Sequence, residues 1–173
     1  SENSPLTGKI RDYTLAELKA AFPIDTLDET VAWCKENGQA IAFELKSRAL
    51  DMYDYMPEIA RQLADTIAKY DFYDMCFVFS TDYRTLRMVK ELQPRTPLGL
   101  IVPIVPVDPV ALMREMDAII YLTYIDSLSP EIVAQLHDAG YYVDGSVINT
   151  KDRLEKALEL GVDLIESDHP VAT

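Results

Sequence analysis

Histidine, cysteine, glycine-rich loops and long hydrophobic runs are all scarce in this sequence of 173 residues. The longest apolar run, Leu98 to Val107, is broken by Pro103 and Pro106 and falls far short of the roughly 20 residues that a membrane span requires. No glycine-rich phosphate loop follows an apolar segment, which argues against a dinucleotide-binding open sheet. The start of the chain is too polar for a signal peptide. The sequence therefore predicts no transmembrane segment.

Basic residues are also few, with 16 Lys and Arg against 29 Asp and Glu, a net charge of −13. This negative charge repels a phosphate backbone, so nucleic acid is not an expected partner. It equally disfavours unaided binding of a small phosphate anion, which would need a buried cation or a metal ion. Cys34 and Cys76 lie in apolar stretches without metal-ligand or redox spacing, which predicts buried free thiols and a cytoplasmic location.

What the chain does contain is a regular alternation of helices and strands. Capping patterns at Thr14 and Thr26 predict helices through Ala20 and from Leu27 to Asn37, the second closed by Gly38. Because apolar strands then alternate with helices, we expect a parallel sheet covered by helices. The predicted strands are 41–46, 75–80, 98–103, 118–124, 141–148 and 162–167, and the helices between them are 57–70, 83–92, 109–116, 130–139 and 151–160.

A closed barrel and an open doubly wound sheet both satisfy this alternation, and the missing phosphate loop favours the barrel. A complete barrel needs eight units and about 250 residues. The expected fold is therefore of the α/β class, an incomplete TIM (β/α)-barrel of about six parallel strands with outer helices. Right-handed crossovers predict strands in sequence order with helices on the convex face. Two unpaired edges and an open inner face predict a cover, either a second copy in a homo-oligomer or a partner segment.

The clearest candidate site lies in the strand from Ile41 to Lys46. Period-two alternation places Glu44 and Lys46 on one face, pointing into the barrel at the carboxyl end, where active sites of this architecture are built. Burying these opposite charges costs free energy unless a metal ion and an anion partner them. The alternative is a mutual ion pair at the surface.

Other polar residues are weaker candidates because they also serve as helix caps and turn formers. His137 lies within a predicted helix and is interpreted as a packing or surface residue, whereas His169 follows the last strand and could face the site. The short polar residues that follow the other strands are Ser80, Asp82, Asp144, Ser146, Ser167 and Asp168.

Four segments resemble the glycerophosphodiester phosphodiesterase family: Ala42–Lys46, Ser80–Asp82, Gly99–Leu100 and, above all, Asn149–Pro170 with its Gly-Val-Asp and Asp-x-Pro elements. The resemblance covers nearly the whole chain in order. It implies a TIM barrel that hydrolyses glycerophosphodiesters to glycerol 3-phosphate and an alcohol, using a divalent metal, Ca or Mg, and two histidines. It further implies Glu44 as a metal ligand, Lys46 as a phosphate contact, and Ser146 at a substrate-binding position where the family usually has Trp.

The family's two histidines and its Glu-x-Asp metal ligands precede the point that corresponds to Thr7, so no catalytic residue is assigned in this chain. Residues 1–173 are interpreted as a single glycerophosphodiester phosphodiesterase-like domain lacking its first two strands. Two functions stay open: a fragment of an active phosphodiesterase, and a degenerate non-catalytic member acting as a structural or interaction domain. A Schiff-base lyase using Lys46 is a third hypothesis, weakened because Glu44 would keep Lys46 protonated.

Overall fold

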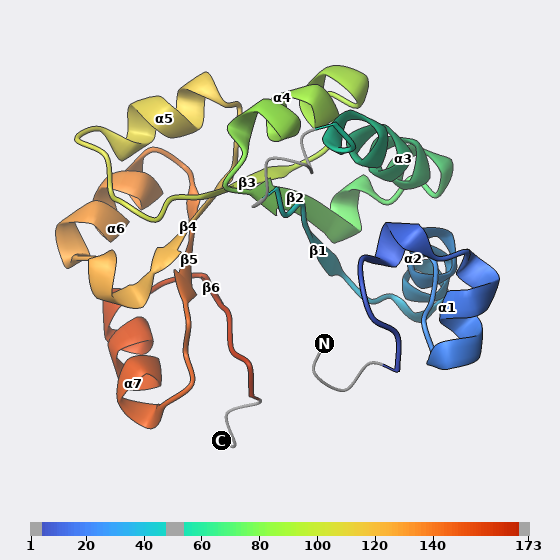
Figure 1. The fold of residues 1–173 in the computed structure, drawn as a ribbon. Coiled ribbons are helices and arrows are strands. Elements are labelled where there is room, and N and C mark those ends of the chain that lie inside the picture. Colours follow the sequence, from blue (N-terminus) through green and yellow to red (C-terminus); the bar gives the residue numbers. More distant parts are fainter. Residues whose placement is uncertain (1–4, 48–53, 170–173) are drawn as a thin grey trace.

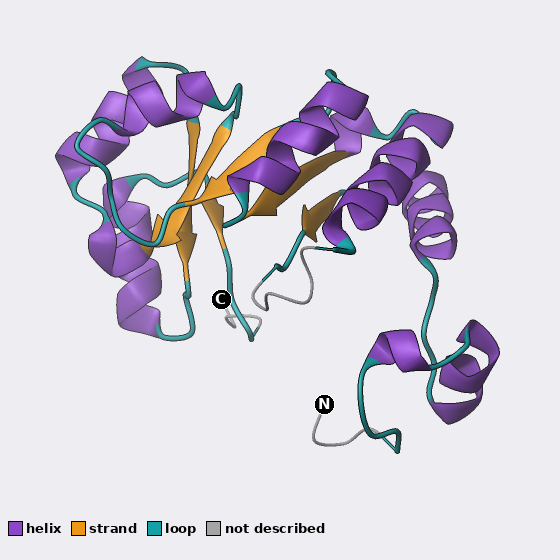
Figure 2. Cartoon of the chain, turned by 45° about the horizontal axis from the view of Figure 1, so that its top comes forward, coloured by secondary structure: helices purple, strands orange, loops and turns teal. Residues whose placement is uncertain are grey.

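The chain builds a curved sheet whose outer side is wrapped by helices (Figure 1). The computed structural model describes residues 5–47 and 54–169. Each strand pairs in parallel with the next, in sequence order, and Figure 2 shows the helices on the convex side of the sheet. The predicted incomplete barrel, with helices outside, is therefore confirmed. The strands are β1 Ile41–Glu44, β2 Cys76–Ser80, β3 Leu98–Ile101, β4 Ile120–Tyr124, β5 Tyr142–Ser146 and β6 Leu164–Ile165.

The helices begin and end largely where their capping residues predict. The hydroxyls of Thr14 and Thr26 accept hydrogen bonds from the third amide of their helices, and Gly38 ends the second helix in the left-handed region at φ 65°. The helices are α1 Leu15–Ala21, α2 Leu27–Asn37, α3 Met56–Lys69, α4 Tyr83–Leu92, α5 Pro109–Glu115, α6 Pro130–Asp138 and α7 Lys151–Leu160, with short 3-10 turns η1 Ile10–Asp12, η3 Tyr73–Met75 and η4 Ile125–Ser127.

Four strands begin later than predicted. β2 starts one residue late because the Met75 amide closes the turn η3 on the Phe72 carbonyl, and the other three start late because the residues before them belong to the preceding helix. The amides of Ala118, Tyr141 and Val162 donate backwards to the carbonyls of residues 113, 136 and 157, at 3.1, 3.0 and 3.3 Å. An amide used in this way closes the helix and cannot enter the sheet ladder. The predicted starts at 118, 141 and 162 were therefore wrong by two residues, one residue and two residues.

Four strands, β1, β3, β5 and β6, also end earlier than predicted, and β5 ends at Ser146 instead of residue 148, whereas β2 and β4 end as predicted. β1 ends at Glu44 and not at Lys46, β3 ends at Ile101 before Pro103, which has no amide proton to donate, and β6 ends at Ile165. Beyond these points the chain diverges into loops on the same side of the sheet. Lys46 consequently lies just past its strand, on the loop side of the sheet where a site can form.

The two faces of the sheet are packed very differently. On the convex face, strand side chains join the main hydrophobic core beneath the helices, and five of them have no exposed surface: Val78, Leu98, Leu100, Tyr121 and Val143. On the concave face Phe79, Ile120 and Leu122 form a separate small cluster, with Phe77 and Ile101 partly buried against it. The convex core is complete within this chain, whereas the concave face is only partly covered.

Both cysteines are free and buried, as predicted. Cys76 lies at the start of β2, and burial raises the pKa of its thiol to about 11, so it stays protonated at neutral pH. Within residues 5–47 and 54–169, no helix has the length and apolar character needed to cross a membrane.

Candidate functional site

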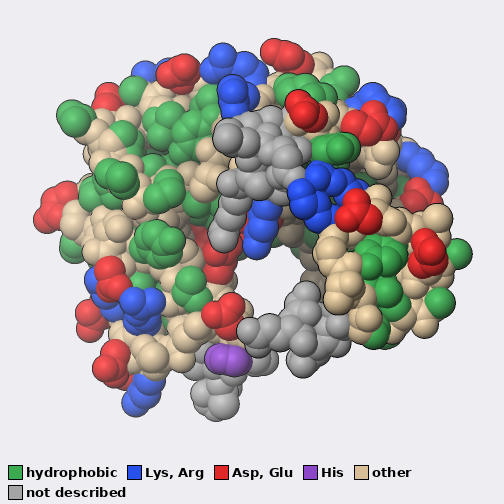
Figure 3. Space-filling model, in the orientation of Figure 1, with side chains coloured by type: hydrophobic (Ala, Val, Ile, Leu, Met, Phe, Trp, Pro, Cys, Tyr) green, Lys and Arg blue, Asp and Glu red, His purple; other side chains and the backbone are tan. Residues whose placement is uncertain are grey.

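A hollow of about 370 Å³ opens at the carboxyl ends of the strands. Its apolar floor includes Phe79, Ile101 and Leu122 from the concave cluster. Figure 3 looks onto this side of the molecule, where acidic and basic side chains border a central opening. Four strands, β1, β4, β5 and β6, each place a polar or charged residue at or near their carboxyl ends in this lining. The polar lining consists of Glu44, Lys46, Thr123, Ser146, Glu166 and Asp168.

Glu44 and Lys46 both line the hollow, as their spacing predicts, and they also bind each other. The ammonium of Lys46 lies 3.1 Å from a carboxylate oxygen of Glu44, with the two side chains 58% and 27% exposed. The Leu45 amide between them donates to the Phe79 carbonyl at 2.9 Å, which holds the alternation past the end of β1. The pair therefore faces the hollow and is at the same time a mutual ion pair, and the predicted metal and phosphate roles of Glu44 and Lys46 stay predictions.

Glu166 is the site residue that the sequence analysis missed. It follows β6 directly and lines the hollow opposite β1. Burial raises its pKa, the nearby Glu44 carboxylate raises it further, and the Lys46 ammonium opposes both effects. The alternation Leu164, Glu166, Asp168 was the available signal, because it is the same period-two pattern that identified Glu44 and Lys46.

Asp144 lies deeper on the same concave face. Its register neighbours are Leu122 on β4 and Leu164 on β6, and only 3% of its surface is exposed. One of its carboxylate oxygens has no hydrogen-bond partner among the described residues. Burial, with a smaller effect of Glu166, raises its pKa from 3.8 to about 7. It does not line the hollow, so it influences the site through charge alone.

Ser146, Ser167 and Asp168 lie at the ends of β5 and β6. The Ser146 hydroxyl donates weakly to the Thr123 carbonyl, at 3.4 Å, and borders the hollow. Asn149 ties the chain after β6 in place, because its amide nitrogen donates to Asp168 at 2.7 Å and its oxygen accepts from the Asp168 amide at 2.9 Å. The Ser167 hydroxyl donates to the same oxygen at 3.1 Å. Ser167 therefore has a structural role, whereas Asp168 is held by Asn149 and also lines the hollow.

Ser80 and Asp82 hold the loops together and do not face the hollow. The buried Ser80 hydroxyl donates to the Leu45 carbonyl, and the Asp82 carboxylate accepts from Ser47 at 3.1 Å and from the Thr85 hydroxyl at 2.9 Å. Although burial raises the pKa of Asp82, the hydrogen bonds from Thr85 and Ser47 outweigh it and the pKa is lowered overall. The expectation that these residues are caps and turn formers is confirmed.

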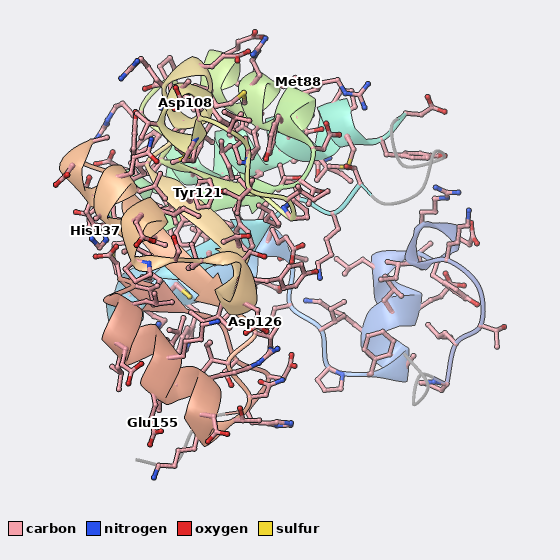
Figure 4. The ribbon with its side chains drawn as sticks, turned by 90° about the vertical axis from the view of Figure 1, so that its left-hand side faces the viewer. Met88, Asp108, Tyr121, Asp126, His137 and Glu155 are labelled. Carbon is pink, nitrogen blue, oxygen red and sulfur yellow. The ribbon has the colours of Figure 1, made fainter. Side chains whose placement is uncertain are left out.

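Neither histidine lines the hollow. His137 lies on α6 at the outer surface (Figure 4), with its Nε2 atom 2.9 Å from the carboxylate of Asp163. That same oxygen accepts the Val143 amide at 2.8 Å, so the contact joins α6, β5 and the start of β6. His169 is exposed and follows the last strand. Its backbone contacts Ser167.

The divalent metal that the resemblance implies does not fit these side chains. In the described part of the chain, no group of three or more histidine, cysteine, aspartate or glutamate side chains lies close enough to hold an ion. Calcium and magnesium require several oxygen ligands. Here the carboxylate of Glu44 is already neutralised by the Lys46 ammonium at 3.1 Å. These residues alone therefore do not complete a metal centre.

Comparison with known proteins identifies relatives of this chain. No family model matches the sequence. The glycerophosphodiester phosphodiesterase of Caldanaerobacter subterraneus is 26% identical over 175 residues, which cover 94% of this chain and 70% of that relative. The glycerophosphodiester phosphodiesterase of Bacillus altitudinis is 25% identical over 180 residues, covering 95% of this chain and 72% of the relative.

Solved structures share the fold. An Oleispira antarctica phosphodiesterase in complex with the product sn-glycerol-3-phosphate has a TM-score of 0.83 at 23% identity, covering 97% of this chain and 72% of that one. A glycerophosphoryl diester phosphodiesterase from Parabacteroides distasonis has a TM-score of 0.70 at 20% identity, covering 96% and 64%. Since the curated relatives align with almost the whole chain and the solved structures share its barrel-type sheet, the chain is similar to glycerophosphodiester phosphodiesterases over nearly its full length.

Proposed function

We propose that this chain forms one part of a glycerophosphodiester-hydrolysing site, in which Lys46 contacts the phosphate and Ser146 borders the alcohol. The observation that carries the proposal is convergence: Glu44, Lys46 and Ser146, the residues to which the family resemblance gives roles, line one hollow. They come from opposite regions of the sheet, β1 and β5, and only the fold brings them together. The hollow lies at the carboxyl ends of parallel strands, where this architecture places its chemistry.

Hydrolysis itself needs groups that the described residues do not provide. A phosphodiester requires a base to activate water and an acid to protonate the leaving alcohol, and each contributes orders of magnitude in rate. No histidine lines the hollow within the described ranges, and Glu44 is paired with Lys46. We therefore assign phosphate binding to this chain, and we assign no proton transfer and no metal-dependent step to it.

The charges in the hollow make this assignment testable by binding. Three carboxylates, Glu44, Glu166 and Asp168, surround the single ammonium of Lys46. Among the described lining residues, the three carboxylates repel a phosphate dianion and the Lys46 ammonium attracts it, so sn-glycerol 3-phosphate should bind weakly, with a dissociation constant on the order of millimolar. Binding should be lost in Lys46→Ala and strengthened in Glu166→Gln, which removes a negative charge.

Titration followed by ¹H–¹⁵N NMR checks this directly. The matched control is Lys151→Ala on α7, where the lysine side chain is 83% exposed and pairs with Glu155 on the same helix. The control should titrate as the unmodified chain does. Unchanged binding in Lys46→Ala would remove the basis of the proposal.

A non-catalytic role is the second candidate, favoured by the small hydroxyl of Ser146 at a position where the family resemblance implies an aromatic wall. An experiment that adds the part of a relative without a counterpart in this chain distinguishes the two functions. The chain spans 70% of the length of its Caldanaerobacter relative. When the part of that relative without a counterpart here is added, metal-dependent turnover that requires Lys46 supports the enzyme, and a complex without turnover supports the structural role.

A further inference from the structure

The loop after β3, residues 103–107, is apolar throughout and projects into solvent. Ile104 is 86% exposed and Val107 is fully exposed, at 106%. Pro103 is also exposed, and Val105 and Pro106 are half-buried. Soluble proteins seldom leave a contiguous group of large apolar side chains in water without a binding role. The loop carries no charged residue between Pro103 and Val107.

Both ends of the loop are fixed. On the sheet side the Val102 amide donates to the Leu122 carbonyl at 2.8 Å, and the Thr123 hydroxyl donates to the Val102 carbonyl at 2.6 Å. On the helix side Asp108, labelled in Figure 4 at the start of α5, accepts the Ala111 amide at 2.9 Å. Since the anchors are rigid and two of the residues are proline, the loop is held in its projecting form.

The open barrel does not explain this exposure. β3 is paired on both sides, with β2 and β4, and the unpaired edges of the described sheet are those of β1 and β6. A segment that completed the barrel would add to those edges, far from the middle strand. The loop also borders the hollow, because its first residue, Pro103, is one of the residues that line it. Tyr124 at the end of β4, which is 54% exposed, lines the same hollow.

We infer that residues 103–107 insert into a zwitterionic lipid surface and hold the mouth of the hollow against it. A stable protein interface buries about 800 Å² on each partner, which five loop residues cannot supply, whereas interfacial binding to lipid needs only a few apolar side chains. Tyr124 has the amphipathic character of residues found at the membrane–water boundary. The net charge of −13 selects a neutral, phosphatidylcholine-like surface over an anionic one. The inference does not depend on the proposed hydrolysis.

Sedimentation with sucrose-loaded vesicles tests the inference without any substrate. The unmodified chain should sediment with phosphatidylcholine vesicles, and less with vesicles rich in phosphatidylglycerol. Ile104→Ser combined with Val107→Ser should lower the partition coefficient roughly tenfold or more, because two large apolar side chains are removed from the contact. The control is Leu158→Ser on α7, which removes a side chain that is 73% exposed elsewhere and should change nothing.

A fluorescent reporter gives an independent measurement. The sequence has a single tryptophan, Trp33 on α2, so Trp33→Phe with Ile104→Trp moves the only indole to the loop. Its emission should shift to the blue on adding phosphatidylcholine vesicles. Three results would overturn the inference: no vesicle binding by the unmodified chain, equal binding by the serine double variant, or a dimer in light scattering that the double variant abolishes, which would make the loop a self-association surface.

Discussion

The convex and concave faces of the sheet show how one set of strands serves two purposes. On the convex face, Leu98, Leu100 and Val143 are completely buried against helices that this chain supplies. On the concave face, the apolar cluster is small and is accompanied by carboxylates, two of which, Asp144 within β5 and Glu166 after β6, have raised pKa values because they are buried. Stability therefore comes mainly from one face, and the other keeps charges that an optimised core would exclude.

The largest expected effect belongs to the convex face. Leu100→Ala deletes a fully buried side chain and should lower the free energy of unfolding by about 2–5 kcal/mol, through lost transfer energy and the cavity left behind. Leu164→Ala is the matched change on the concave edge, where the side chain is 37% exposed, and should cost less than about 1.5 kcal/mol. Urea unfolding of both variants measures the difference, and equal losses would break the comparison.

The next effect is pH-dependent and comes from Asp144. Its pKa is raised from 3.8 to about 7, so the folded state binds a proton that the unfolded state releases between these values. Stability from this group is fully present below pH 3.8 and is lost as pH rises to about 7, by on the order of 4 kcal/mol. Asp144→Asn keeps the shape without the charge.

Urea unfolding at two pH values isolates this contribution. Asp144→Asn should be more stable than the unmodified chain at pH 8, by about 4 kcal/mol at most, and should differ from it by less than about 1 kcal/mol at pH 4. Carboxylates with lowered pKa values, such as Asp82, oppose the trend in both proteins and cancel in the comparison. A difference between the two proteins that does not change with pH would show that Asp144 is charged throughout this range.

The smallest effect concerns coupling across the hollow. Burial and the Glu44 carboxylate raise the pKa of Glu166, and the Lys46 ammonium opposes them, so Lys46→Ala should raise that pKa further. Carbon-detected NMR titration of the Glu166 carboxyl measures it, with Lys151→Ala, an exposed lysine on α7 that does not line the hollow, as the control. A lowered pKa in Lys46→Ala would mean that the two side chains do not share the hollow in solution.

The sequence predicted the concave site only where the signal lay within one strand. Glu44 and Lys46 are two residues apart, so their common face follows from the pleat alone. The position of Asp144 between Leu122 and Leu164 depends on the register of three strands, which no local pattern contains. Glu166 belongs to the same period-two pattern as Glu44, but the polar residues Ser167 and Asp168 that follow it make the pattern hard to distinguish from a loop.

The fold was more predictable than the site because alternation and capping act locally. The helix from Leu27 to Asn37 and its closure at Gly38 follow from residues within the segment itself, and the structure has the predicted bounds. The strand starts were wrong at Ala118 and Val162 because their amides complete the preceding helix. That competition between two backbone partners is decided by the geometry of the turn, which residue types alone do not reveal.

The most direct test of the incomplete concave site is the hydrolysis of glycerophosphocholine by the purified chain with millimolar calcium or magnesium. Because the described residues provide neither a complete ligand set nor a histidine at the hollow, we expect hydrolysis no faster than in buffer. Metal-dependent turnover that disappears in both Glu44→Gln and Lys46→Ala would contradict the account, and would show that this chain's own carboxylates complete the site.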